Sequence, residues 1–144
     1  MKRAALLLAV AALAAAVSGC ASTGVTEGRL NASVGPTFER MYRWKQQLQG
    51  ASTAKPLNTS ANCLRGDASV DDQGAGTDWV CTIRFLINGP GTPVSFGWNV
   101  TAKANGCWTA DGAPAQLGGQ TIQTRTGQTL NNPIYAVDGC FPAT

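Results

Sequence analysis

The sequence predicts an α+β domain, in which one N-terminal amphipathic helix packs on a small antiparallel β-meander that two disulfides hold together. Three observations lead to this fold class. Apolar residues recur at helical spacing between residues 36 and 50, apolar and polar residues alternate in two stretches between 79 and 102, and four cysteines are spread between 63 and 140. Such a helix and sheet bury their apolar faces against each other.

The predicted helix starts at Pro36 and stops at Gly50, because proline suits a first helical turn and glycine suits a helix end. One broad side of this helix is apolar and carries Phe38, Met41, Tyr42, Trp44 and Leu48. We expect that side to pack on the sheet, with the ammonium of Lys45 reaching from its edge to solvent. The alternative is that the apolar side lies on a membrane surface, aided by Arg40 and Arg43.

Residues 79–87 and 94–102 form the predicted hairpin. In both stretches apolar residues alternate with polar ones, as on strands with one buried face. For the two apolar sets to share that face, Cys81 has to lie opposite Val100, which leaves residues 89–92 as the loop.

A third strand is expected to follow directly. Asn105 and Gly106 are typical of a two-residue turn, and the next strand then begins at Cys107. This turn places Trp108 opposite Lys103, on the polar face of the sheet. Two short strand candidates come later, at residues 120–125 and 134–137.

The same registers restrict the disulfides. Cys81 and Cys107 are offset by four positions along the strand between them, about 13 Å at 3.3 Å per residue, whereas bonded cysteines have Cα atoms less than about 7 Å apart. Two pairings of the four cysteines remain. We favour Cys63 with Cys81 and Cys107 with Cys140, because these bonds tie the segment before the first strand and the C-terminus to the sheet.

The first twenty residues have the pattern of an export signal. Lys2 and Arg3 precede an uncharged apolar run over residues 4–17, which is short for a membrane-spanning helix. The run ends in Val17-Ser18-Gly19-Cys20, which resembles the lipobox of bacterial lipoprotein precursors. This resemblance implies a signal peptide at residues 1–19, lipid on Cys20, and anchoring to the bacterial cell membrane surface or the outer membrane. Lipidation of Cys20 also leaves an even number of cysteines for disulfides.

The mature chain is expected to have a lipid-anchored flexible tether at residues 20–35 and a single globular domain at residues 36–144. Removing Lys2 and Arg3 from the 11 basic side chains leaves nine against eight acidic ones, and no basic stripe with interleaved aromatics is present. This balance gives no reason to expect a nucleic-acid partner. We expect the membrane, reached through the lipid on Cys20, and an envelope protein or small ligand as partners.

The chain has no histidine, which excludes catalytic sites of the Ser/His/Asp and Cys/His kinds. Asp71, Asp72 and Asp78 lie close together in the sequence, and three carboxylates can hold calcium. Their spacing does not fit an EF-hand loop, so we expect an acidic solvated turn there and neither a metal nor a cofactor.

The residues above predict a non-catalytic binding module whose site is the sheet face around Trp108, with Arg84 and Asn99. An exposed tryptophan among polar groups suits recognition of a sugar or a protein. In the competing interpretation, residues 111–140 fold over this face and bury Trp108. Two other functions stay open: a small cell-wall or glycan-acting enzyme that uses carboxylates, and a secreted-type inhibitor that presents the loop at residues 88–92.

Overall fold

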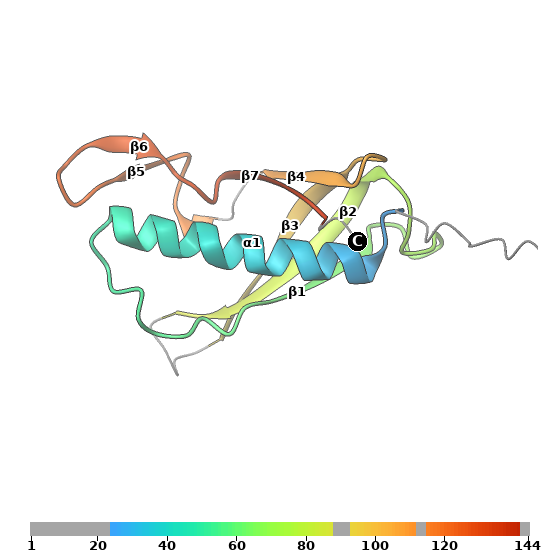
Figure 1. The fold of residues 1–144 in the computed structure, drawn as a ribbon, viewed down its shortest axis with the longest axis horizontal. Helices are drawn as coiled ribbons and strands as arrows, with labels where there is room; N and C mark the ends of the chain where they lie inside the picture. Colours follow the sequence, from blue (N-terminus) through green and yellow to red (C-terminus); the bar gives the residue numbers. More distant parts are fainter. Residues whose placement is uncertain (1–23, 88–92, 112–114, 142–144) are drawn as a thin grey trace, which may run out of the picture.

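The computed structural model describes residues 24–87, 93–111 and 115–141. Within these residues the chain forms one long α-helix, a short 3₁₀ helix and seven β-strands (Figure 1). In chain order they are α1 Glu27–Leu48, β1 Ser60–Arg65, β2 Gly76–Leu86, β3 Pro93–Ala102, β4 Cys107–Asp111, η1 Ala115–Leu117, β5 Thr121–Gln123, β6 Thr129–Asn131 and β7 Ala136–Cys140.

The predicted α+β class is confirmed. Strands β1, β2, β3, β4 and β7 form one sheet in that order, with every neighbouring pair antiparallel. Helix α1 crosses one face of this sheet, which we call the inner face (Figure 1). Strands β5 and β6 form a separate hairpin beside the C-terminal end of α1.

The predicted tether at residues 20–35 is wrong over most of its length, because α1 begins at Glu27 rather than at Pro36. Thr26 caps the helix, and its side-chain oxygen accepts a hydrogen bond from the backbone N–H of Arg29 at 3.3 Å. Residues 25–35, which were expected to be loose, are therefore part of the folded domain.

Burial of two aliphatic side chains explains the early start of α1. Leu30 and Val34 are both 0% exposed, and burying each one stabilises the fold by roughly 1.5–3 kcal/mol. An interior proline costs a helix about 3 kcal/mol, so the two burials together offset the presence of Pro36. At the other end the prediction holds, since the helix stops at Leu48 and Gly50 follows with a φ of 72°.

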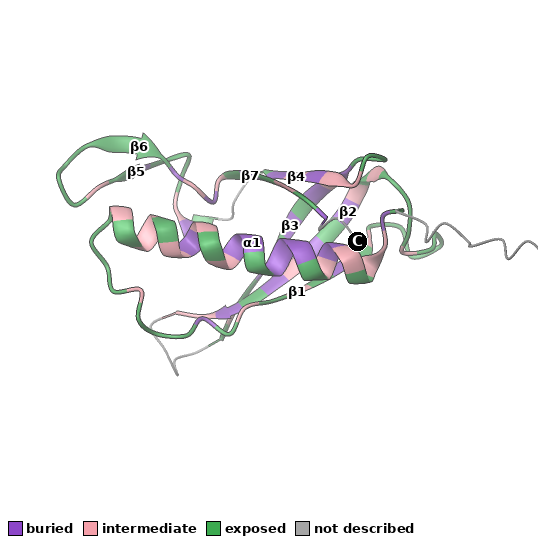
Figure 2. Ribbon diagram, viewed as in Figure 1, coloured by how far each residue is buried: buried purple, intermediate pink, exposed green. Residues whose placement is uncertain are grey.

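The apolar side of α1 packs on the sheet as predicted at Phe38 and Tyr42, but Trp44, which was assigned to the same side, is exposed. The ring of Phe38 lies between 5.0 and 6.0 Å from those of Phe85, Phe96 and Trp98, measured between centroids. Figure 2 shows the buried stripe along α1 and the buried residues of the strands beneath it. The alternative, in which this side of the helix lies on a membrane, is wrong because the sheet covers it.

The hairpin of β2 and β3 is confirmed, but its register differs by two residues. Cys81 lies opposite Trp98 rather than Val100. A shift of two residues keeps every side chain on its predicted face, so the apolar residues of both strands still face α1. The predicted loop at residues 89–92 lies outside the described residues.

The register of β3 and β4 differs from the prediction by one residue, and this reverses the faces. Trp108 lies opposite Ala102 instead of Lys103. The cause is a longer turn: the backbone N–H of Lys103 donates to the carbonyl of Cys107, and that of Gly106 donates to the carbonyl of Lys103. A shift of one residue moves every side chain of a strand to the other face.

Both favoured disulfides are confirmed. Cys63 is bonded to Cys81 and Cys107 to Cys140, and each pair lies directly opposite across neighbouring strands. The first bond is fully buried on the inner face, whereas Cys140 is exposed on the outer face. Disulfides are typical of an oxidising compartment, which places the domain outside the cytoplasm. Among the described residues, the structure contains no helix both long and apolar enough to cross a membrane.

Candidate functional site

The predicted site around Trp108 is wrong, because this side chain is 0% exposed. Its indole Nε1 donates a hydrogen bond of 2.8 Å to the hydroxyl of Ser33 on α1. Strand β7 covers it from the side, with Gly139 directly opposite in the register. The competing interpretation, in which residues 111–140 fold over the polar face and bury Trp108, is right about the burial but wrong about its cause, because Trp108 lies on the inner face under α1 and β7 pairs beside it.

Arg84 and Asn99 do lie on the exposed outer face, but the structure does not bring them together. Arg84 is paired with Ser95 on β3, and Asn99 is four residues further along that strand, about 13 Å away. Arg84 lines a shallow depression of about 300 Å³ with three neighbours: Ser60, Asn62 and Thr82. This face contains no aromatic residue from the predicted site.

The three aspartates form structural contacts and do not converge on one point. Asp72 accepts a hydrogen bond of 2.6 Å from the backbone N–H of Arg65, and Asp78 forms an ion pair of 3.0 Å with the Arg65 guanidinium. Asp71 accepts a hydrogen bond from the side chain of Gln73. No group of three or more potential metal ligands occurs among the described residues.

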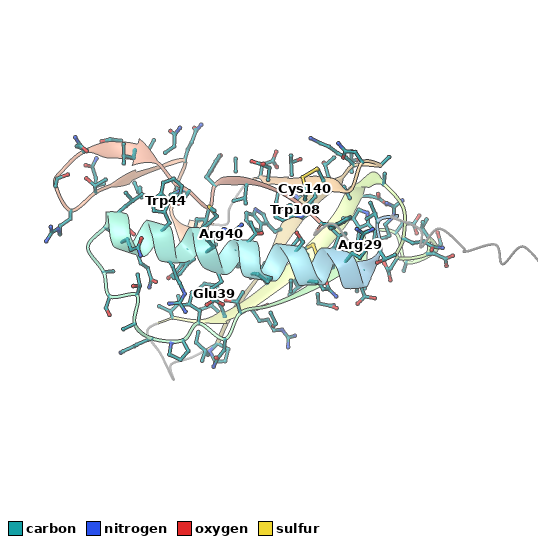
Figure 3. All side chains as sticks on the ribbon, in the orientation of Figure 1. Arg29, Glu39, Arg40, Trp44, Trp108 and Cys140 are labelled. Carbon is teal, nitrogen blue, oxygen red and sulfur yellow. A yellow bond between two sulfur atoms is a disulfide. The ribbon has the colours of Figure 1, made fainter. Side chains whose placement is uncertain are left out.

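The structure instead exposes Trp44, whose side of α1 faces the chain that leads into β7 (Figure 3). Trp44 is 51% exposed, whereas Trp79, Trp98 and Trp108 are at most 1% exposed. It borders a depression of about 300 Å³, which we call the Trp44 groove. The residues that line the groove are Met41, Trp44, Asn131, Asn132, Pro133, Ala136, Val137 and Asp138.

A second depression adjoins the Trp44 groove. It has a volume of about 160 Å³ and shares with the groove Asn131, Asn132 and Ala136. Gln120 and Tyr135 complete its lining. The two depressions are therefore neighbours that share part of their lining, and each has an aromatic residue, Trp44 in one and Tyr135 in the other.

Asn132 holds the wall between the two depressions in place. This residue is 3% exposed, and its side-chain amide donates hydrogen bonds to the carbonyls of Leu117 at 3.0 Å and Gly119 at 2.9 Å. Its side-chain oxygen accepts a hydrogen bond from the backbone N–H of Ile134. Because all three contacts are satisfied inside the protein, the shape of this wall does not depend on a ligand.

Lys45 attaches the same wall to α1. Its ammonium donates a hydrogen bond of 2.5 Å to the carbonyl of Leu117, which also accepts from Asn132. The predicted route of this side chain to solvent is therefore wrong. Burial lowers the pKa of Lys45, because a charged ammonium loses hydration there.

The remaining polar side chains of the site are available to a ligand. Among the described residues, Gln120, Asn131 and Asp138 have no hydrogen-bond or ion-pair partner for their side chains, and all three are exposed. The described lining includes one carboxylate and neither lysine nor arginine. An aromatic surface beside amides and a carboxylate can bind a ligand through stacking and hydrogen bonds.

Sequence reasoning missed this site because it assigned Trp44 to the core side of the helix. Trp44 follows Phe38 by six residues, which places it about 120° from Phe38 around the helix at about 100° per residue. The buried residues Leu30, Val34 and Phe38 recur every four positions. Had the helix been extended back to Leu30, this narrow stripe would have placed Trp44 on its flank.

No known protein family, curated protein or solved structure matches this chain. The site therefore has to be interpreted from its own geometry. The lipobox with Cys20 and the loop at residues 88–92 both lie outside the described residues, so the lipid anchor and the inhibitor interpretation stay predictions.

Proposed function

We propose that this chain is an exported lipoprotein, cut before Cys20 and anchored through it, whose domain is a non-catalytic binding module. The ligand binds in the Trp44 groove. The observation that carries the proposal is the half-exposed indole of Trp44 beside polar side chains that have no partner within the described residues. A protein that buries its other tryptophans gains nothing in stability by leaving this one in water.

The cysteines support the export and lipidation part of the proposal. Four of the five cysteines of the chain form disulfides, which leaves Cys20 as the fifth. This residue ends the pattern that resembles a lipobox. An exported chain with one remaining thiol requires an explanation for it, and attachment of a lipid supplies one.

The position of the groove also fits an anchored protein. Val25 is already buried, and the five residue-to-residue steps from Cys20 to Val25 can span at most about 18 Å. The anchor is therefore attached close to the start of α1. Trp44 lies 17 residues beyond Glu27, about 26 Å along the helix axis, so the groove is far from the start of α1. Figure 1 shows the two ends of α1 at opposite sides of the domain.

Binding is favoured over glycan hydrolysis by the number of carboxylates in the groove. Most glycosidases place two carboxyl groups about 5 to 9.5 Å apart across the scissile bond. The described lining supplies Asp138 alone. A single carboxylate can accept hydrogen bonds from a ligand without providing the acid and base pair that hydrolysis needs.

Mass spectrometry of the mature protein tests the anchor. We expect an N-terminal peptide that begins at Cys20 and carries the mass of a diacylglyceryl group. We also expect that Cys20→Ala releases the protein from the membrane fraction, while Cys140→Ala does not. An unmodified Cys20, or a cut at another position, contradicts the anchor.

Photo-crosslinking in cells tests the groove, whatever the class of the ligand. A photoreactive residue in place of Asn131 is expected to form adducts that disappear when Trp44→Ala is added. The same residue in place of Asn99, on the outer face, serves as the control. Adducts that persist in Trp44→Ala, or equal adducts from both positions, contradict a ligand in the Trp44 groove.

A further inference from the structure

We infer that the ligand of the Trp44 groove is a neutral saccharide chain, an inference that rests on the proposed function and names its ligand class. Three features of the site carry it: an accessible aromatic surface, polar side chains without intramolecular partners, and a described lining that holds no cation.

The aromatic feature is Trp44 itself. One face of a sugar ring presents mainly C–H groups, and this weakly apolar face stacks on an indole, whose ring is both large and rigid. With 51% of its surface exposed, Trp44 has room for such a stack without any movement of the core. The fixed wall around Asn132 keeps the space beside the indole open.

The polar feature is the set of side chains around the two depressions. Sugar hydroxyls donate and accept hydrogen bonds, and the amides of Gln120 and Asn131 do both, whereas Asp138 accepts only. The site therefore offers the mixture of donors and acceptors that a ring with several hydroxyls requires. A purely apolar ligand would leave these groups without partners.

Charge separates a neutral ligand from an anionic one. Proteins that bind phosphate or sulfate groups place arginine, lysine or a helix N-terminus against them. The described lining has none of these, and Asp138 would repel an anion. Nucleic acids, phosphorylated lipids and sulfated sugars therefore fit the site less well than an uncharged sugar.

Shape favours a chain over a single sugar. The depressions of about 300 Å³ and about 160 Å³ meet along Asn131 and Asn132, and each has its own aromatic residue, Trp44 in one and Tyr135 in the other. The larger depression alone has the volume at which small-ligand sites begin, about 300 Å³. Neighbouring units of an oligosaccharide can occupy the two parts.

Isothermal titration of the full mature protein in detergent tests the inference. The probes are chitotetraose and cellotetraose, two neutral tetrasaccharides that differ in their acetamido groups, with a sulfated tetrasaccharide as the anionic comparison. We expect at least one neutral probe to bind and the sulfated one to bind more weakly. We expect Trp44→Ala to reduce the affinity about tenfold or more, and Trp44→Phe to retain part of it.

Leu130→Ala is the matched control. Leu130 is 39% exposed on the neighbouring β6 and does not line either depression, so its replacement is expected to leave the affinity unchanged. Binding of neither neutral probe, equal binding by Trp44→Ala, or preference for the sulfated probe overturns the saccharide inference.

The crosslinking experiment separates this failure from a failure of the proposed function. If adducts from position 131 require Trp44 but prove to be peptides, the groove binds a protein partner and only the saccharide inference is wrong. If no adduct requires Trp44, the groove is not a binding site and both proposals fail.

Discussion

One flank of helix α1 is buried at one end and exposed at the other. Ser33 and Trp44 are eleven residues apart, three helical turns, so they lie on nearly the same side of α1. At the Ser33 end, β4 and β7 close over the flank, and the Ser33 hydroxyl contacts both Trp108 and the carbonyl of Cys140. At the Trp44 end only the first residues of β7 come near the flank, and they line the groove while the indole stays half exposed.

The comparison teaches that a tryptophan here becomes structural or accessible according to which strand reaches it. Trp108 was predicted on the polar face of the sheet and is buried, whereas Trp44 was predicted on the apolar side of the helix and is exposed. Local polarity therefore does not separate the two. The two tryptophans differ instead in their position relative to β7, the edge strand that pairs with β4.

The largest loss of stability is expected when a side chain is removed at the covered end of this flank. Trp108→Ala removes a fully buried indole and leaves the Ser33 hydroxyl without its donor, so we expect a loss of about 3–5 kcal/mol in the free energy of unfolding. Urea denaturation followed by circular dichroism measures it. A loss below 1 kcal/mol would mean that Trp108 is not packed between α1, β4 and β7.

Removal of either disulfide is expected to cost less. The bonds span 18 and 33 residues, for which chain entropy predicts about 3 and about 4 kcal/mol. Double replacement by alanine, Cys63 with Cys81 or Cys107 with Cys140, is measured by the same denaturation. A negligible change for both pairs would contradict the role of the disulfides in holding the sheet edges.

The two bonds are also expected to differ in their reaction with reductant. Cys140 is exposed, while both cysteines of the first bond are 0% exposed, so mild reduction of the folded protein should open the second bond first. Alkylation followed by mass spectrometry identifies the freed thiols. If Cys63 were labelled before Cys140, the first bond would be the more accessible one, which contradicts its burial in the structure.

The sequence was sufficient to predict the fold class, both disulfides and the buried face of the β2–β3 hairpin. These depend on alternation along each strand, and alternation survives a register error of two residues, which is the error made at Cys81. The disulfide prediction also survived, because the separation of Cys81 and Cys107 stays too large in either register.

The site could not be predicted in the same way. Asn105 and Gly106 have the composition of a two-residue turn, but the turn closes from Lys103 to Cys107 and reverses the faces of β4. Exposure of Trp44 depends on how β7 runs past the flank of α1, and that path follows the pairing of β7 with β4 and not the residues near Trp44 in the sequence. Neither long-range pairing leaves a local signal.

A smaller loss of stability is expected from adding a methyl group against the indole of Trp108. A Cβ added at Gly139 would lie 2.7 Å from Cζ2 of that indole, closer than carbon atoms can pack. Gly139→Ala is expected to lower the free energy of unfolding by about 1–3 kcal/mol. Gly97→Ala is the control, because its added Cβ would lie 3.6 Å from Val80, an ordinary contact. Equal stabilities of the two variants would contradict the close packing of Trp108 on β7.

The smallest effect on stability is expected at the open end. Trp44 is half exposed, so Trp44→Ala should change the free energy of unfolding by about 1 kcal/mol or less, while Trp108→Ala changes it several times more. A neutral tetrasaccharide that binds should narrow this contrast, because it should raise the cost of Trp44→Ala and leave the cost of Trp108→Ala unchanged. At 100 times the dissociation constant, a ligand raises the stability of the unaltered protein by about 2.7 kcal/mol, and a variant that has lost the stacking surface should gain far less. If Trp44→Ala destabilised the domain as much as Trp108→Ala does, the exposed indole would be a structural element, and both ends of the flank would serve the fold alone.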